Sequence, residues 1–188
     1  MKHKYIIALG SSAGGLKALI EFFDNSLPDS VSYVITTHLH PHQKSILAEI
    51  LQKHSMIEVC DAENNIQVKS NTVYVMPENK DMSFNKGRLI LTKRDLSIKI
   101  NMAIDNFFLS LADDTEYKKI AIILSGLGTD GTIGVRAIAE KGGYIIAQIP
   151  VSADEDSMPK GVIASGYADK ILYPQNMPQA IIDYVNDN

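Results

Sequence analysis

A short uncharged apolar run that turns into an amphipathic helix within a few residues limits most strongly how this chain folds. Residues 6–9 read I-I-A-L, which is typical of a strand buried on both faces of a parallel sheet. We expect this strand to stop at Gly10. Apolar residues then recur at positions 16, 19, 20 and 23, which is the spacing of one helical face. The pattern therefore predicts a buried strand that leads directly into a covering helix.

The same alternation continues along the chain. Further strands are predicted over residues 31–36, 57–60, 71–76, 120–124, 144–147 and 170–172, and helices over residues 46–54, 104–111, 133–138 and 177–185. Residues 82–92 predict a hairpin that turns at Gly87, and residues 150–159 predict a loop. We therefore expect an α/β protein of three α/β/α layers, with a doubly wound, mostly parallel sheet and an inserted β-hairpin, in which residues 1–188 form one domain.

Composition excludes several classes of function. The 188 residues are 45% hydrophobic, which suits one full core, and the net charge of −4 is spread over mixed signs. A nucleic-acid partner is not expected, because no basic stripe is present to neutralise phosphates. No apolar run approaches the ~20 residues of a membrane span, so membrane insertion is not expected. Cys60 is the only cysteine, which excludes an internal disulfide and fits the reducing cytoplasm.

The turn after the first strand has the spacing G-x-S-x-G, from Gly10 to Gly14. This spacing suits a nucleophile elbow, in which the glycines permit a tight turn and the middle serine, Ser12, projects from the tip of the strand. The helix that follows directs backbone N–H groups at the same point, where they could hold a developing oxyanion or a bound phosphate. A serine in such a turn can also be a simple cap or spacer.

Three polar residues directly follow predicted strands: Ser12, His38 and Asp130. The carboxyl ends of parallel strands share one edge, so these residues could converge as a Ser-His-Asp triad, in which histidine activates the serine and aspartate orients the histidine. Each has an alternative reading. Asp130 could cap the helix that follows it, and His38 could be a core histidine. His38, His40 and His42 alternate and could instead bind a metal in a hydrolase.

Several separated motifs together resemble one family, the catalytic domain of chemotaxis protein-glutamate methylesterases. The matching pieces are I-I-A-L-G-S-S-A-G-G-L at 6–16, V-I-T-T-H-L at 34–39, N-T-V-Y-V-M-P at 71–77, I-I-L-S-G-L-G-T-D-G at 122–131, G-G-Y-I-I-A-Q at 142–148 and M-P at 158–159. They run nearly end to end in the family's order. Three places depart from the usual pattern and border the expected substrate: Asn101-Met102-Ala103, Leu127 and Thr37.

The resemblance implies a serine hydrolase that demethylates glutamyl methyl esters on chemoreceptors, and deamidates certain glutamines, without metal or cofactor. It implies that Ser12 is the nucleophile, His38 the base and Asp130 the orienting carboxylate. Oxyanion or substrate contacts are implied at Ser11, Ala13 and Leu127. It also implies methyl-accepting chemoreceptors as partners. Family members usually carry a receiver domain ahead of this region, and the motif at residue 6 leaves no room for one in this chain.

Two other classes stay open at this point. One is the metal-dependent hydrolase that would use the alternating histidines. The other is a module without turnover, which would bind phosphate in the turn of residues 10–15 or dock on a receptor. The oligomeric state is left open.

Overall fold

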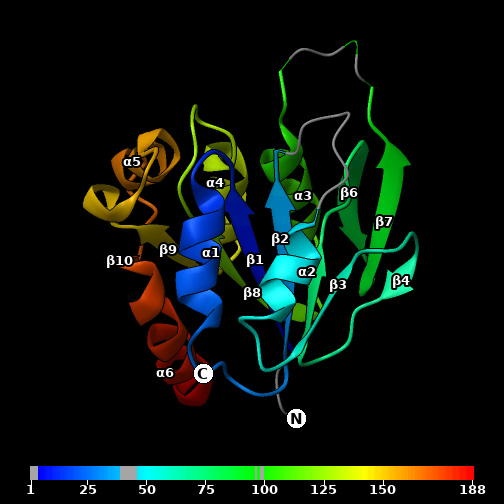
Figure 1. The fold of residues 1–188 in the computed structure, drawn as a ribbon, viewed down its shortest axis with the longest axis horizontal. Helices are drawn as coiled ribbons and strands as arrows, with labels where there is room; N and C mark the ends of the chain where they lie inside the picture. The colour runs from blue at the N-terminus through cyan, green and yellow to red at the C-terminus, as the bar shows by residue number, and fades with distance from the viewer. Residues whose placement is uncertain (1–3, 39–45, 96, 98–99) are drawn as a thin grey trace.

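A seven-stranded parallel sheet forms the centre of the molecule in the computed structural model, which describes residues 4–38, 46–95, 97 and 100–188 (Figure 1). Its strands are β1 (Lys4–Ser11), β2 (Val31–Thr37), β3 (Glu58–Asp61), β5 (Thr72–Val75), β8 (Tyr117–Ile123), β9 (Tyr144–Gln148) and β10 (Lys170–Leu172). The order is β10-β9-β8-β1-β2-β5-β3, and every neighbouring pair is parallel. The predicted doubly wound α/β architecture is confirmed.

β1 lies between β2 and β8, so the chain winds away from it in both directions. The register pairs Ser11 with Thr37 of β2 and Gly10 with Ile123 of β8, so the three strands end level with one another. Ligands of such sheets bind outside the carboxyl ends of the strands where the winding direction reverses. The fold therefore brings the residues after β1, β2 and β8 to one edge.

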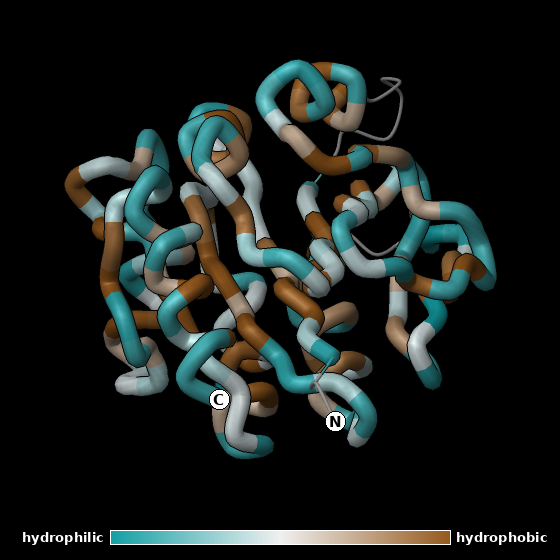
Figure 2. Tube along the Cα trace, turned by 90° about the horizontal axis from the view of Figure 1, so that it is seen from below, coloured by the Kyte–Doolittle hydropathy of each residue, from teal (hydrophilic) through white to brown (hydrophobic). Residues whose placement is uncertain are grey.

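Helices cover both faces of the sheet. One face carries α1 (Gly15–Phe23), α2 (Leu47–Gln52) and α6 (Met177–Asp187), and the other carries α3 (Ala103–Ala112), α4 (Thr132–Glu140) and α5 (Ser157–Ala164). Side chains of β1 alternate between two buried clusters, because Ile7 and Leu9 pack toward α1 while Ile6 and Ala8 pack toward α3. Long hydrophobic stretches accordingly run through the middle of the molecule (Figure 2). Among the described helices, none has the length and apolar character needed to cross a membrane.

The predicted hairpin is confirmed but belongs to a slightly larger sheet. β6 (Lys80–Asn85) and β7 (Arg88–Lys93) pair antiparallel, and β4 (Ile66–Gln67) adds a third strand to the free edge of β7. Lys86 and Gly87 form the turn with φ angles of 48° and 76°, which is the turn type that glycine favours in hairpins. β4 is only two residues long, so it carries no alternation that a sequence pattern could reveal.

The prediction of a loop over residues 150–159 is wrong at its end, where residues 157–159 are helical. A short 3₁₀ turn (Pro150–Ser152) is followed by the helix α5, which begins at Ser157. Only Met158, Pro159 and Val162 of this helix are buried, so its two turns carry too little apolar periodicity to stand out. Asp156 at the N-cap and a proline in the first turn were the available signals of a helix start.

Candidate active site

Ser12, His38 and Asp130 form a hydrogen-bonded sequence at the carboxyl edge of the sheet. The hydroxyl Oγ of Ser12 lies 3.1 Å from Nδ1 of His38, and Nε2 of the same imidazole lies 2.6 Å from Oδ2 of Asp130. Only 20% of the His38 side chain and 4% of the Asp130 side chain are exposed. The residues are 26 and 92 positions apart, and the parallel register of β1, β2 and β8 brings them together.

The surroundings of Asp130 determine which imidazole nitrogen carries the proton. Its Oδ2 accepts the backbone N–H of Ile104 at 3.0 Å, and its Oδ1 accepts that of Asp105 at 2.8 Å. A carboxylate only accepts hydrogen bonds, so the 2.6 Å contact of Asp130 with Nε2 of His38 requires that this nitrogen carries the proton. This leaves the lone pair of Nδ1 directed at the Ser12 hydroxyl, which donates to it.

The alternative reading of Asp130 as the cap of its own helix is wrong. The N-cap of α4 is Gly131, which has a φ of 95°, and no side-chain cap bond is made from that position. The Asp130 carboxylate turns instead to the first turn of α3, where Ile104 and Asp105 donate to it. A helix that neighbours it in space, rather than in sequence, thus determines its orientation.

A second buried carboxylate is close enough to Asp130 for the two charges to interact. Asp105, in the first turn of α3, is 2% exposed, and its Oδ1 accepts the backbone N–H of Gly134 in α4 at 2.7 Å. Its Oδ2 is buried with no hydrogen-bond partner among the described residues. Burial, and then the charge of Asp130, raise the pKa of Asp105 to about 6. Asp130 and Asp105 thus each bind the first turn of the other's helix.

The backbone around Ser12 leaves some N–H groups occupied and others open. The N–H of Ser12 donates to the carbonyl of Ser125 at 2.9 Å, so it is already used. Within the described residues, no partner is found for the N–H of Ala13 or of Leu127. Ser11 is 1% exposed at the end of β1, and its side chain packs beneath Gly15. Of the residues predicted around the serine, Ala13 and Leu127 therefore offer unpaired donors.

Sequence reasoning missed Ser125, which ties the turn after β1 to the loop before α5. Its hydroxyl donates to the carbonyl of Ala13 at 2.8 Å and accepts the N–H of Glu155 at 3.0 Å. A Cβ on Gly14, whose φ is 73°, would lie 2.7 Å from the same oxygen and 2.6 Å from Cβ of Asp154. Ser125 could have been found as the first polar residue after β8, level with Ser12.

Two hollows flank Ser12. The larger, of about 610 Å³, runs along α1 and is lined by residues that include Leu16, Lys17 and Asp154. The smaller, of about 240 Å³, is lined by both Ser12 and His38 and is otherwise mostly apolar; its other lining residues are Ser11, Leu16, Leu19, Thr37, Leu47 and Ile50. The small hollow is therefore the one that both the serine and the imidazole face.

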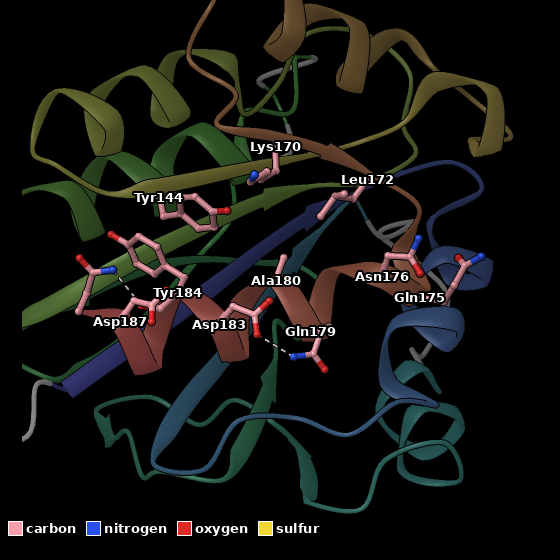
Figure 3. Close-up of a pocket in the computed structure, with 11 residues that line it drawn as sticks. Tyr144, Lys170, Leu172, Gln175, Asn176, Gln179, Ala180, Asp183, Tyr184 and Asp187 are labelled. Atoms are coloured by element: carbon pink, nitrogen blue, oxygen red, sulfur yellow. Dashed lines mark hydrogen bonds between the residues drawn. The ribbon is translucent and has the colours of Figure 1, made fainter.

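A separate hollow of about 580 Å³ lies between α6 and the strands β9 and β10 (Figure 3). Tyr144 and Tyr184 stack there with ring centroids 4.1 Å apart, beside Lys170. None of the residues predicted for the site lines this hollow. His40 and His42, the other members of the predicted metal alternative, lie outside the described residues.

Comparison with known proteins identifies close relatives. The profile of the family described as CheB methylesterase matches residues 7–181. A protein-glutamate methylesterase/protein-glutamine glutaminase of Bacillus licheniformis is 34% identical over 97% of this chain and 53% of its own length. One of the same name from Thermotoga maritima is 32% identical over 96% of this chain and 54% of its own. The chain thus spans about half the length of these curated relatives.

The crystal structure of the Thermotoga maritima CheB methylesterase catalytic domain superposes with a TM-score of 0.86 at 32% sequence identity. The match covers 96% of this chain and 98% of that one. The small antiparallel sheet and the seven-stranded sheet therefore belong to one shared architecture.

Proposed function

The chain belongs to the CheB methylesterase family, and from this premise we propose that it hydrolyses glutamyl methyl esters with Ser12 as nucleophile, His38 as general base and Asp130 as orienting carboxylate. The observation that carries the proposal is the unbroken hydrogen-bond sequence from the Ser12 hydroxyl through both imidazole nitrogens to a buried carboxylate. A serine hydroxyl is nearly inert at neutral pH without such a base.

The reaction proceeds in two halves. Nδ1 of His38 takes the proton of Ser12 as Oγ attacks the ester carbon, and the imidazolium returns that proton to the departing methoxide, which leaves as methanol. Water then attacks the acyl-enzyme as His38 takes one of the water's protons. The bond between the acyl carbon and Oγ breaks, and the imidazolium gives the proton to Oγ of Ser12 as the glutamate carboxylate is released. Asp130 stays ionised and stabilises the imidazolium in both halves.

The unpaired backbone N–H groups of Ala13 and Leu127 are the proposed donors to the oxyanion. Ala13 follows the nucleophile, which is the position that supplies one oxyanion donor in a nucleophile elbow. Because Ser12 already donates its own N–H to Ser125, it is not assigned this role. Donors that are fixed before the reaction stabilise the developing charge without reorganisation.

The small apolar hollow is proposed to receive the leaving group. The leaving oxygen must lie within reach of the imidazole that protonates it, and this hollow is lined by both Ser12 and His38. The larger groove along α1 then remains for the polypeptide that carries the ester. Deamidation of glutamine would follow the same steps, with ammonia in place of methanol.

The proposed substrates are the methylated glutamates of methyl-accepting chemoreceptors in the cytoplasm. This assignment follows from the family and from the relatives' names as glutamate methylesterase and glutaminase. The open donors beside Ser12 would suit either an oxyanion or a phosphate. The His38–Asp130 pair favours an acyl-transfer site, because a phosphate binder does not require it.

The test is methanol release from a methylated chemoreceptor fragment. We expect Ser12→Ala to remove activity by a factor of about 10³ or more, and Ser165→Ala, a matched change at the end of α5, to leave it unchanged. A fluorophosphonate probe should label Ser12 stoichiometrically, and EDTA should have no effect. Wild-type turnover in Ser12→Ala, or a folded protein that the probe does not label, would overturn the proposal.

A further inference from the structure

Asp105 lies outside the hydrogen-bonded sequence of Ser12, His38 and Asp130, yet its surroundings couple it to that sequence. Its backbone N–H donates to Oδ1 of Asp130 at 2.8 Å, while its own Oδ1 accepts the N–H of Gly134 at 2.7 Å. Asp130, just ahead of α4, thus binds the first turn of α3, and Asp105 in α3 binds the first turn of α4. The position of the Asp130 carboxylate depends on the start of α3, and that start is held to α4 through Asp105.

The chemistry of the Asp105 side chain is unusual for a purely structural contact. The residue is 2% exposed, and its second carboxylate oxygen has no hydrogen-bond partner in the described parts of the chain. A buried carboxylate whose second oxygen is unpaired is costly, and a neutral amide or hydroxyl could accept the Gly134 N–H at lower cost. Such a costly group is expected where its charge has a use.

Charge is what Asp105 can add to this site. Asp130 is the charged side chain whose field raises the pKa of Asp105, while the backbone N–H groups of Gly134 and of Gly131, the N-cap of α4, lower it. Among the residues that the structure describes, no cationic side chain is a cause of its shifted pKa. An ionised Asp105 therefore adds a second negative charge that interacts with Asp130, the residue that binds the imidazole of His38.

We propose that Asp105 is a positioning residue, which fixes the Asp130 carboxylate through the first turn of α3 and whose charge acts on the pair formed by Asp130 and His38. This inference rests on the proposed function for its catalytic consequence, but its effect on the imidazole is independent of turnover. It adds to the site a residue that touches neither the substrate nor the reacting atoms.

The variant Asp105→Asn keeps a carbonyl oxygen for Gly134 and removes the charge. A negative charge favours the protonated imidazole, so removing it should lower the pKa of His38. We expect the His38 ring resonances, followed by NMR across pH, to titrate about half a unit or more lower than in the wild type. The acid limb of the kcat/KM profile should move to lower pH by the same amount.

A matched control is Asp114→Asn. Asp114 also accepts two backbone N–H groups, from Glu116 and Tyr117, but it precedes β8, at the opposite end of that strand from the site. This variant should leave the His38 titration and the pH profile unchanged.

Asp105→Ala separates the two parts of the role. It removes both the charge and the acceptor of Gly134, so kcat should fall about 10-fold or more below that of Asp105→Asn at the optimal pH of each. If Asp105→Ala does not fold, the NMR titration of Asp105→Asn still decides the proposal.

The proposal is overturned if the His38 titration of Asp105→Asn superposes on that of the wild type. It is also overturned if a folded Asp105→Ala retains wild-type kcat. If the imidazole titration of Asp105→Asn shifts from that of the wild type but neither the wild type nor this variant releases methanol, the inference about Asp105 holds and the proposed function fails.

Discussion

Two helices, α1 and α4, begin at the same edge of the sheet in the same way, but the backbone N–H groups at their starts differ. One at the start of α4 donates to a side-chain carboxylate, whereas one just ahead of α1 has no acceptor among the described residues. Both α1 and α4 are entered through a left-handed glycine, Gly14 with φ 73° and Gly131 with φ 95°, and neither has a side-chain cap of its own. At α4 a carboxylate from another helix, that of Asp105, accepts the N–H of Gly134. Just ahead of α1, the N–H of Ala13 has no partner in the described chain.

The difference shows how one edge can be both rigid and reactive. The first turns of α3 and α4 donate backbone N–H groups to the carboxyl groups of Asp130 and Asp105, so Asp130 is held in place before any substrate arrives. Within the described part of the chain, the N–H groups of Ala13 and Leu127 beside Ser12 are open, as the proposed stabilisation of a transient oxyanion requires. Changes to the carboxyl groups at α3 and α4 should therefore affect activity and stability differently from changes to the turn that carries the open N–H groups beside Ser12.

The largest effect is expected from Asp130→Asn, which changes the carboxylate held by the first turn of α3. An amide can present its N–H₂ group to Nε2 of His38 and so favour the tautomer that cannot accept the serine proton. We expect kcat/KM for methyl ester hydrolysis to fall by about 10⁴-fold with the fold retained, as measured by methanol release and circular dichroism. A loss smaller than 10-fold would show that Asp130 does not orient the imidazole.

Gly14→Ala perturbs the turn between β1 and α1, next to the open N–H of Ala13. An alanine at φ 73° is strained, and its Cβ would lie within 2.7 Å of Cβ of Asp154 and of Oγ of Ser125, which is held by the N–H of Glu155. We expect about 2 to 4 kcal/mol lower stability and about 10- to 100-fold lower kcat, because Ala13 must move.

Gly142→Ala is the matched control for that change. Gly142 has a similar φ of 79°, and a Cβ there would meet nothing within 4 Å. Denaturant unfolding should show a loss of only about 1 kcal/mol, with kcat unchanged. Equal losses of kcat in the two glycine variants would mean that the turn after β1 has no special role.

Asp105→Asn should stabilise the protein in a pH-dependent way. The pKa of Asp105 is raised from 3.8 to about 6 in the folded state, so the contribution of this group to wild-type stability falls as the pH rises from about 4 through 6. The variant should match the wild type below about pH 4 and exceed it by up to about 3 kcal/mol above pH 7. Thermal unfolding at pH 4 and pH 8 checks this, and a stability difference independent of pH would contradict it.

The smallest effect is expected at the exposed ion pair that lines the larger hollow along α1. Lys17 and Asp154 lie 3.8 Å apart, with 62% and 54% of their side chains exposed. A pair this exposed contributes little, so Lys17→Met should change stability by less than about 0.5 kcal/mol in urea unfolding. A larger change would show that this pair helps to hold the loop before α5 against α1.

The interpretable sequence signals were those carried by long buried strands. Ser12, His38 and Asp130 could be found because each follows an apolar run, and such runs predict a strand whose end lies at a defined edge. α5 and β4 were missed because they are too short for periodicity to distinguish them from loops. Ser125 and Asp105 were missed because their partners lie 25 or more residues away in sequence.

By itself, the sequence determined the alternation of strands and helices, the burial of the sheet on both faces, and which polar residues stand at the ends of strands. Local propensity and hydrophobic period act over a few neighbouring residues, so these features can be read from short windows. Tertiary structure alone decided that β1 lies between β2 and β8, that Asp130 binds α3 rather than its own helix, and that the Ser12 N–H is occupied while that of Ala13 is open. Hydrogen bonds between distant segments depend on which elements pack together, and no local pattern specifies that packing.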